Sequence, residues 1–330
     1  MIRVFVYEHI TARGLGRDPA SPEHSLFVEG RAMFDAIRED FAAIPGVEVL
    51  TGSPDEFGTL AAKADWSFVI APETDGVLLR LAGEVLQVGG RLLGPSPDAI
   101  APTSDKYALY RHWTTRGVST PETVLCPAIP TSFSCVVKRR DGAGSDGMRI
   151  AEMADALDGL GADWIAQPLH EGIAASVSLL VGRSESLGLP PTFQCIASDG
   201  SFRYSGGGLP IAPQFAVRAE RLGRQALDGI TGLLGYVGVD VILGADADGR
   251  DDVAIEINPR LTTSYVGLRA HLDGNLAGLM LELAEGERGH FGLNPKGRVA
   301  FNASGKCAID PTRPYWNSPS EIPTDPTFFS

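Results

Sequence analysis

Apolar runs and amphipathic stretches alternate along the first hundred residues. Four short apolar runs have the pattern of buried strands, and they lie at residues 2–7, 47–51, 67–72 and 91–94. Two longer stretches carry apolar side chains at helical spacing, at residues 25–44 and 76–87. Strands and helices that alternate at this spacing predict a small α/β domain with a parallel sheet.

The pattern changes after Pro102. Residues 103–117 predict a helix, because hydroxyl and acidic side chains stand at its start and Gly117 stands at its end. Residues 132–140 and 148–153 have the pattern of strands, and they flank a stretch rich in glycine. This part of the chain is therefore expected to form a separate structural unit.

The remaining pattern is mixed. Three further elements are predicted, namely a helix near residues 216–234, a β-hairpin within residues 236–259 and a last helix near residues 275–285. The tail from Pro311 carries five prolines, so we expect it to be extended or wrapped over the surface.

Composition narrows the class of protein and its partners. Hydrophobic residues make up 44% and charged residues 21% of the 330 residues, which is typical of a globular chain with two or three domains. The chain has no run of the roughly 18 apolar residues that a membrane span needs. A formal charge of −13 argues against nucleic acid and anionic membranes as partners. We therefore expect small-molecule partners, and a homodimer is left open.

Cysteine spacing and the N-terminus indicate a cytoplasmic protein. The four cysteines are widely and irregularly spaced, so they predict reduced thiols and neither a zinc site nor a disulfide framework: Cys126, Cys135, Cys195 and Cys307. The first ten residues lack a basic region and reach Glu8 early, so they predict a strand and not a signal peptide.

The glycine-rich stretch "VVKRRDGAGSDGMRI" at residues 136–150 has the spacing G-x-G-x-x-G at Gly142, Gly144 and Gly147. A dinucleotide-binding fingerprint requires an apolar strand that runs directly into the first glycine, whereas four charged residues precede it here. A hairpin whose backbone N–H groups cover phosphates fits better, and a plain surface turn remains the alternative. Local positive charge beside the loop favours the phosphate interpretation.

Residues 236–259 contain acidic side chains on both predicted strands of the hairpin. If the hairpin is symmetric about Asp248, then Asp240 lies directly opposite Glu256, and Asn258 shares the face of Glu256. Carboxylates placed opposite each other destabilise a sheet by about 0.2–1 kcal/mol. A divalent cation between them would reverse this penalty, and a small all-oxygen set suits Mg²⁺. The alternative is a solvated acidic face.

These motifs occur in an order that resembles the ATP-grasp superfamily over roughly residues 100–285. The order is a lysine on a strand, the glycine-rich loop, a linker "QPLHEG" and a terminal "EINPR". The resemblance implies a mixed α/β and α+β fold in which two lobes enclose ATP behind an N-terminal parallel α/β domain. It implies four parts, namely the N-terminal domain at 1–102, a small lobe at 103–168, a C-terminal lobe at 169–290 and a proline-rich tail at 291–330.

The resemblance also implies roles for individual residues. Lys106 and Lys138, two of only five lysines, resemble the phosphate-binding lysines. Asp240, Glu256 and Asn258 resemble the ligands of Mg²⁺, for which Mn²⁺ could substitute, and Arg260 resembles a cation that acts with Lys138 in catalysis. The remaining implied nucleotide-binding residues are Gly142, Gly144, Ser145, Gly147, Gln167, Pro168, Leu169, His170 and Glu171.

Two positions depart from the family pattern. The acid that often binds ribose is replaced by Ala174, and Glu171 is the substitute that we expect. The basic residue that is common two positions before the first metal ligand is replaced by Gly238. Another arginine, Arg203 or Arg269, is then expected to supply the missing positive charge.

The longer string "EINPRLTTSYVGLR", with "YSGGGLP" upstream, is similar to a group of tyramine–glutamate ligases in methanofuran biosynthesis. This similarity implies an ATP-dependent ligase that forms an amide through an acylphosphate and joins glutamate to tyramine or tyrosine. The implied substrate-binding residues are Tyr204, Gly207, Thr262, Thr263, Ser264 and Arg269. From the residues alone, Thr262 to Ser264 are equally consistent with an ordinary helix cap.

Two other functions stay open. A different amino-acid or dipeptide ligase would share all the ATP-binding and metal-binding residues and differ around Tyr204 and residues 262–269. A non-catalytic ATP-binding regulatory module is the alternative of another class. A dinucleotide oxidoreductase is disfavoured, because no correctly spaced glycines follow the first strand.

Overall fold

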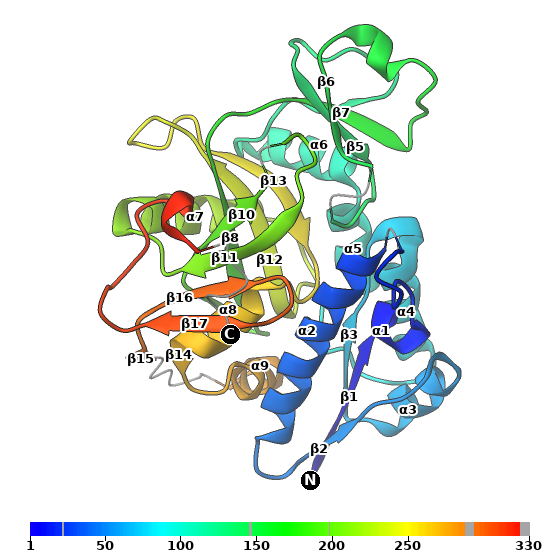
Figure 1. The fold of residues 1–330 in the computed structure, drawn as a ribbon. Coiled ribbons are helices and arrows are strands. Elements are labelled where there is room, and N and C mark those ends of the chain that lie inside the picture. The colour runs from blue at the N-terminus through cyan, green and yellow to red at the C-terminus, as the bar shows by residue number, and fades with distance from the viewer. Residues whose placement is uncertain (22, 145–146, 198, 288–293, 324–330) are drawn as a thin grey trace.

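The computed structural model describes residues 1–21, 23–144, 147–197, 199–287 and 294–323, and the statements below concern these residues (Figure 1). The N-terminal part has a parallel sheet with the order β2–β1–β3. Its strands are β1 (Ile2–Glu8), β2 (Val47–Leu50) and β3 (Trp66–Ile70). Its helices are α1 (His9–Arg13), α2 (His24–Ala42), α3 (Phe57–Lys63), α4 (Val77–Gln87) and α5 (Pro97–Ser104), with 3₁₀ turns η1 (Pro54–Glu56) and η2 (Thr74–Gly76).

A four-stranded antiparallel sheet follows, with the order β4–β7–β5–β6, and it lies at the top of Figure 1. Its elements are α6 (Lys106–Arg116), β4 (Val124–Leu125), β5 (Cys135–Arg139), β6 (Arg149–Ala151), η3 (Ala154–Leu157) and β7 (Trp164–Pro168). Helix α6 begins where Asp105 accepts hydrogen bonds from two backbone N–H groups and ends at Gly117 in the left-handed conformation.

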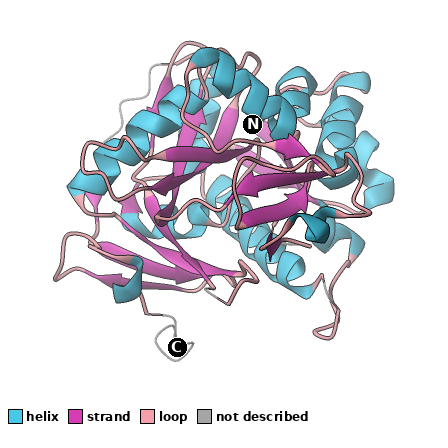
Figure 2. Cartoon of the chain, turned by 90° about the horizontal axis from the view of Figure 1, so that it is seen from above, coloured by secondary structure: helices cyan, strands magenta, loops and turns pink. Residues whose placement is uncertain are grey.

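An eight-stranded sheet forms the rest of the molecule, with the order β13–β12–β8–β10–β11–β16–β17 and β9 paired to β8. Its strands are β8 (Ile173–Val181), β9 (Ser186–Gly188), β10 (Thr192–Ile196), β11 (Tyr204–Leu209), β12 (Gly235–Leu243), β13 (Val253–Asn258), β16 (Arg298–Asn302) and β17 (Cys307–Asp310). The accompanying elements are α7 (Pro213–Ala226), α8 (Ser264–His271), α9 (Leu276–Glu285), η4 (Pro319–Glu321) and the short pair β14 (Leu272–Asp273) and β15 (Asn294–Pro295). Figure 2 shows the strands at the centre and most helices at the periphery.

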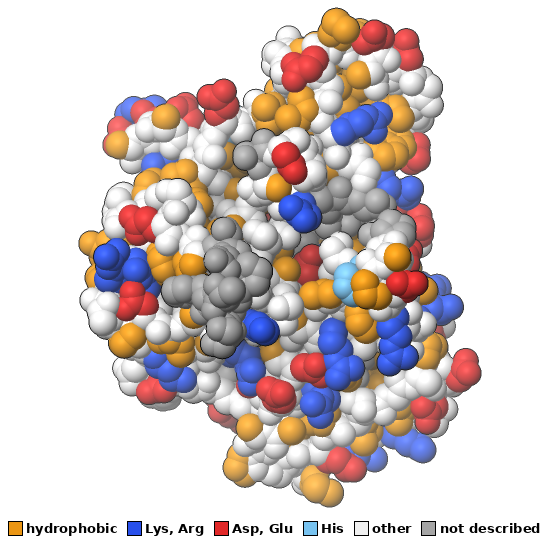
Figure 3. Space-filling view, in the orientation of Figure 1, with side chains coloured by type: hydrophobic (Ala, Val, Ile, Leu, Met, Phe, Trp, Pro, Cys, Tyr) orange, Lys and Arg blue, Asp and Glu red, His pale blue; other side chains and the backbone are white. Residues whose placement is uncertain are grey.

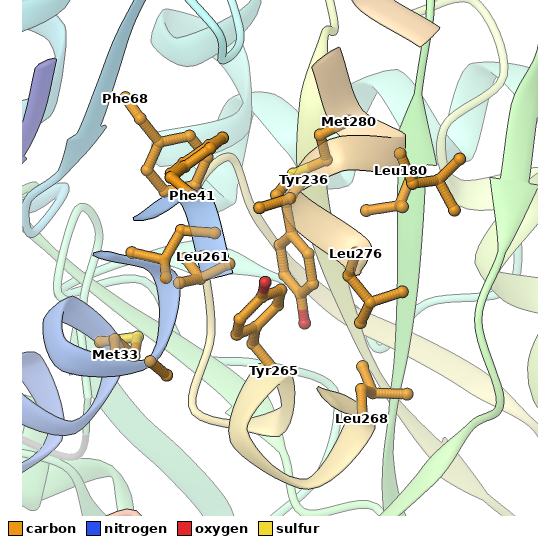
Figure 4. Packing of buried hydrophobic residues seen from close by; sticks show 14 of the residues in the cluster. Met33, Phe41, Phe68, Leu180, Tyr236, Leu261, Tyr265, Leu268, Leu276 and Met280 are labelled. Atoms are coloured by element: carbon orange, nitrogen blue, oxygen red, sulfur yellow. The ribbon is translucent and has the colours of Figure 1, made fainter. Parts of the chain in front are cut away.

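One hydrophobic core joins the N-terminal part to the large sheet (Figure 4). Phe41 of α2 and Phe68 of β3 belong to the same buried cluster as Met280 of α9. Within it the rings of Tyr236 and Tyr265 meet edge to face, with centroids 6.0 Å apart. This shared core fixes α2 against α8 and α9, so the N-terminal part is held in one position relative to the large sheet.

Most predicted elements are present, and three expectations need correction. Residues 91–94 form a single bridge, Ser67 to Leu92, and not a fourth strand. The helix predicted at 216–234 is α7, which ends at Ala226. Part of the predicted tail, residues 291–330, supplies strands β16 and β17 to the large sheet. The boundaries expected at residues 102, 168 and 290 stay predictions.

Residues 312–323 wrap onto the large sheet, as the prolines suggested, but they are also part of the core. Trp316 is buried, its Nε1–H donates to the carbonyl oxygen of Val299 at 3.1 Å, and Arg298 lies over its ring. Among the described residues, no helix combines the length and the apolar character needed to cross a membrane.

Replacement of Trp316 by Ala tests this packing. We expect the free energy of unfolding to fall by about 3–5 kcal/mol, because a large buried side chain is removed and a cavity is left. Urea unfolding followed by circular dichroism measures the change. Tyr315→Ala is the neighbouring control, and an equal, small effect of both substitutions would contradict a core role for Trp316.

Candidate active site

The principal cavity has a volume of about 430 Å³ and lies where the three parts of the chain meet. The N-terminal part contributes the ends of β1 and β3 and one face of α2. The four-stranded sheet contributes β5, the glycine-rich loop and the end of β7. The large sheet contributes β8, β10, β11 and the hairpin of β12 and β13. The cavity thus receives side chains from segments that are far apart in the sequence.

The acidic hairpin has the predicted register at its two facing carboxylates. Asp240 is paired with Glu256 and Gly238 with Asn258. A bulge after Asp240 shifts the rest of the ladder, so Val241 pairs with Ala254. Amide groups surround the first acid, since Asn258 Nδ2–H donates to Asp240 Oδ2 at 3.0 Å and Gln194 Nε2–H donates to Oδ1 at 3.0 Å.

The two facing carboxylates have opposite pKa shifts. Burial, together with the negative charge of Glu256, raises the pKa of Asp240 to about 7. Burial alone would also raise the pKa of Glu256, but the charges of Lys106 and Lys138 outweigh it and hold that pKa below its ordinary value. Lys138 is itself almost fully buried, and this burial lowers its pKa to about 8.

The donor set of the hairpin fits Mg²⁺. Asp240, Glu256 and Asn258 all line the cavity and present carboxylate and amide oxygens. The described ranges contain no group of three or more His, Cys, Asp or Glu side chains that could hold a metal ion. A site with two carboxylates and one amide suits an ion that keeps several waters and binds substrate phosphates, and it does not suit a structural zinc ion.

Lys106 connects the hairpin to the glycine-rich loop. Its Nζ donates to the carbonyl oxygen of Gly142 at 2.6 Å and lies 3.3 Å from Glu256 Oε2. The residue is the first of α6, where Asp105 also accepts a bidentate ion pair from Arg140. Lys106 is absent from the described lining of the cavity, whereas Lys138 belongs to it.

The glycine-rich loop reaches the cavity through Gly144, while Ser145 lies outside the described residues. Gly144 has φ +68° and Gly147 has φ +66°, which is backbone that favours glycine. A Cβ atom at Gly147 would also approach the ring of Trp164 to 2.8 Å. The backbone N–H of Ala143 donates to Thr74 Oγ1 at 3.0 Å, so the loop contacts the N-terminal part.

The predicted linker forms one wall of the cavity. Pro168, Leu169 and His170 line it with Gln167, whose Nε2–H donates to Thr123 Oγ1 at 2.8 Å. The ring of His170 donates from Nε2 to the carbonyl oxygen of Asp251 at 2.7 Å. Glu171 is exposed and does not belong to the described lining, so the structure does not bring it to the cavity as a substitute ribose ligand.

Arg260 also lines the cavity, and the N-terminal part holds its side chain in place. Its guanidinium forms an ion pair with Glu73, with Nε 3.0 Å from Oε1 and Nη2 donating to Oε2 at 3.1 Å. Nearby in the sequence, Thr262 Oγ1 and the hydroxyl oxygen of Tyr236 share a hydrogen bond of 2.8 Å. Thr263 Oγ1–H donates to Glu29 Oε2 at 3.2 Å and makes no side-chain cap to α8.

The structure brings most of the predicted substrate residues together. Tyr204, Thr262, Thr263 and Ser264 line the cavity, whereas Gly207 lines a separate hollow beside β16. Arg269 does not line the cavity, because its guanidinium is bound to Asp40 of α2. Arg203 is also absent from the described lining, so neither arginine supplies the positive charge expected there.

Sequence reasoning missed the contribution of the N-terminal part. The residues that line the cavity from there are Glu8, Ile10, Leu26, Glu29, Gly30, Met33, Ile70, Ala71 and Pro72. Glu8 and Ile70 end two parallel strands, and ligands of open α/β sheets bind outside the carboxyl ends of the strands. That rule is the signal that could have indicated these strand ends. The face of α2 has no comparable signal.

Comparisons with known proteins identify the family and the fold of the chain. A family model of an ATP-grasp domain matches residues 103–264, and a model of the pre ATP-grasp 3 domain matches residues 39–100. The tyramine–L-glutamate ligase of Methanocaldococcus fervens is 32% identical over 235 residues, which are 71% of each chain. The protein of that name from Methanocaldococcus jannaschii is 31% identical over 69% of this chain and 65% of its own length. A solved structure from Archaeoglobus fulgidus, described as an ATP-grasp superfamily protein, has a TM-score of 0.73 at 27% identity and 92% coverage of both chains.

Because Arg269 binds Asp40 and does not line the cavity, we predict that it stabilises the fold and does not contribute to ATP binding. Arg269→Ala should lower the free energy of unfolding by about 1–3 kcal/mol, because Asp40 loses charged hydrogen bonds in a partly buried place. Affinity for ATP, measured by titration calorimetry, should change little. Arg260→Ala is the comparison, and a weaker ATP affinity in Arg269→Ala than in Arg260→Ala would contradict the assignment.

Proposed function

The chain belongs to the ATP-grasp family and is an ATP-dependent carboxylate–amine ligase, and we propose that it joins the γ-carboxyl group of L-glutamate to the amino group of tyramine or a related phenolic amine. One observation carries this proposal. A single cavity holds a buried lysine, two facing carboxylates with an amide, and an arginine, beside apolar side chains of the N-terminal part. The curated relatives named tyramine–L-glutamate ligase support the choice of substrates.

The nucleotide would occupy the half of the cavity between the four-stranded sheet and the hairpin. Val136 of β5 and Ile242 and Ile255 of the hairpin present apolar surfaces there, and the linker backbone offers polar groups for a base. Lys138 would bind phosphate oxygens, and the loop at Gly144 would cover them. The residue that contacts the ribose remains unassigned.

Asp240, Glu256 and Asn258 would hold Mg²⁺, or Mn²⁺ in its place. When bound, the ion would neutralise phosphate charge and orient the phosphate oxygens. The pairing of Asp240 with Glu256 across the hairpin supports this assignment, and burial together with the negative charge of Glu256 raises the pKa of Asp240.

The chemistry requires positioning and charge neutralisation more than covalent help from the protein. The glutamate carboxylate would attack the γ-phosphate, which gives an acylphosphate and ADP. The ammonium group of the amine would lose one proton, and the neutral nitrogen would then attack the acyl carbon. The C–O bond to phosphate would break, and phosphate would leave with the second proton of the nitrogen. Lys138 and Arg260 would stabilise the negative charge, and the loop and linker would exclude water from the acylphosphate.

A different amino-acid ligase remains the alternative for the substrates. It would share the nucleotide half of the cavity and differ in the part lined by α2 and Tyr204. The placement of the product in methanofuran-type cofactor biosynthesis stays a prediction, as do a cytoplasmic location and a homodimer.

The proposal is tested by the release of ADP from ATP, Mg²⁺ and L-glutamate with one amine at a time. We expect release to rise with tyramine and the coupled amide to be detected by mass spectrometry. Tyrosine, alanine and no amine are the comparisons. A response to alanine alone would retain a ligase but reject the phenolic amine, and ATP binding without turnover under any pairing would reject glutamate with these amines as the substrates.

The metal assignment is tested by Asp240→Asn and Glu256→Gln. Each should lower ADP release by roughly 100-fold or more, because a preorganised charged group at the phosphates is lost. Asp248→Asn is the matched control, since this carboxylate lies in the exposed loop of the same hairpin and pairs with Arg250. Unchanged Mg²⁺-dependent ATP binding in both site variants would reject the assignment.

A further inference from the structure

A carboxylate of the N-terminal part faces the cavity and takes no part in the chemistry above. Leu26, Glu29, Gly30 and Met33 of α2 all line the cavity. Their spacing of three and four residues places them on one helical face. Figure 1 shows α2 between the N-terminal sheet and the large sheet. This face carries one charged group among apolar neighbours.

Glu29 is not neutralised by the protein. Within the described residues its carboxylate forms no ion pair, and Thr263 Oγ1–H is its hydrogen-bond donor. Burial raises the pKa of Glu29, which the Thr263 hydrogen bond and the more distant charge of Arg260 only partly offset. Carboxylates withdrawn from solvent are normally paired, so this partly buried group, which lines the cavity, points to a cationic ligand.

The neighbouring carboxylate, that of Glu8, already accepts hydrogen bonds from the backbone. Its two oxygens accept from the backbone N–H groups of Ile10 at 3.1 Å and Thr11 at 2.6 Å, and it caps α1. Gly30 permits this close packing, because a Cβ atom there would approach the Glu8 carboxyl group to 2.8 Å. Within the described residues the other carboxylate oxygen of Glu29, Oε1, has no hydrogen-bond donor.

Two other carboxylates near the cavity, those of Glu73 and Glu256, already have cations. Arg260 is paired with Glu73, and Lys106 is paired with Glu256. The apolar side chains around Glu29 include Ile10, Leu26 and Met33. A ligand for this place would therefore combine a positive charge with an apolar body, which describes an aromatic amine better than the short polar glutamate.

We propose that Glu29 binds the ammonium group of the acceptor amine and that the α2 face with Ile10 forms the pocket for its aromatic body. This inference rests on the proposed function. Thr263 lies three residues after Arg260, so its hydrogen bond to Glu29 joins the acceptor pocket to the phosphate side of the cavity. The N-terminal part thereby determines the specificity for the second substrate.

The test is a comparison of two reactions in the full-length protein. Amide formation with tyramine requires recognition of an ammonium group. Formation of γ-glutamyl hydroxamate from ATP, glutamate and hydroxylamine requires only the acylphosphate, because hydroxylamine is small and uncharged at neutral pH. Glu29→Gln should lower kcat/KM for tyramine by about 10- to 100-fold relative to hydroxamate formation, the effect of a lost charged hydrogen bond.

Two further variants keep the outcome decisive. Glu29→Asp retains the charge, so its loss with tyramine should be smaller than that of Glu29→Gln. Asp35→Asn is the matched control, since Asp35 lies on the outer face of α2 and pairs with Arg31 at 2.6 Å. The midpoint of thermal unfolding is measured for each variant to confirm that it is folded.

Each remaining outcome overturns the inference. Equal losses in Glu29→Gln and Glu29→Asp would show that the charge is not the cause. A raised KM for glutamate with an unchanged KM for tyramine would assign Glu29 to the other substrate. If unsubstituted protein releases ADP with tyramine and Glu29→Gln does so equally well, the inference alone fails. Absence of tyramine-dependent turnover in the unsubstituted protein would instead reject the proposed function, and this inference with it.

Discussion

Two carboxylates, Asp240 and Glu256, face each other across a buried hairpin, and much of the surrounding structure offsets their repulsion. Amide N–H groups of Asn258 and Gln194 donate to the first acid, and Lys106 forms an ion pair with the second. Lys106 is the first residue of α6, which follows the N-cap Asp105, and its Nζ also donates to the glycine-rich loop. The acidic pair therefore links the four-stranded sheet to the large sheet, and the remaining negative charge favours a divalent cation.

The N-terminal part completes the cavity because it shares a core with the large sheet. Phe41 and Phe68 pack with the side chains of α8 and α9, so the face of α2 and the ion pair of Glu73 with Arg260 have fixed positions. On the face of the molecule in Figure 3, acidic and basic side chains are interspersed. Within the cavity, burial strengthens the interactions of charged groups.

Local patterns predicted the parts of the site whose geometry is local. Counting from Asp248 gave the pairing of Asp240 with Glu256, because register in a short hairpin depends on the turn between its strands. Arg269 was wrongly grouped with Ser264, since five residues along a helix rotate a side chain by about 140°. It points from α8 to Asp40. Glu29 could not be inferred, because its environment depends on a tertiary contact with Thr263, which is 234 residues away.

Steric crowding explains why Gly238, and not a basic residue, lies two positions before Asp240. A Cβ atom at this position would approach Thr262 Cγ2 to 2.8 Å, and Thr262 is itself hydrogen-bonded with Tyr236. A basic side chain cannot enter there unless this pair moves. The described lining contains one lysine and one arginine, Lys138 and Arg260. It contains four carboxylates, those of Glu8, Glu29, Asp240 and Glu256. A triphosphate would meet a net negative lining, so we propose that its binding at this site requires a metal ion that neutralises the hairpin carboxylates.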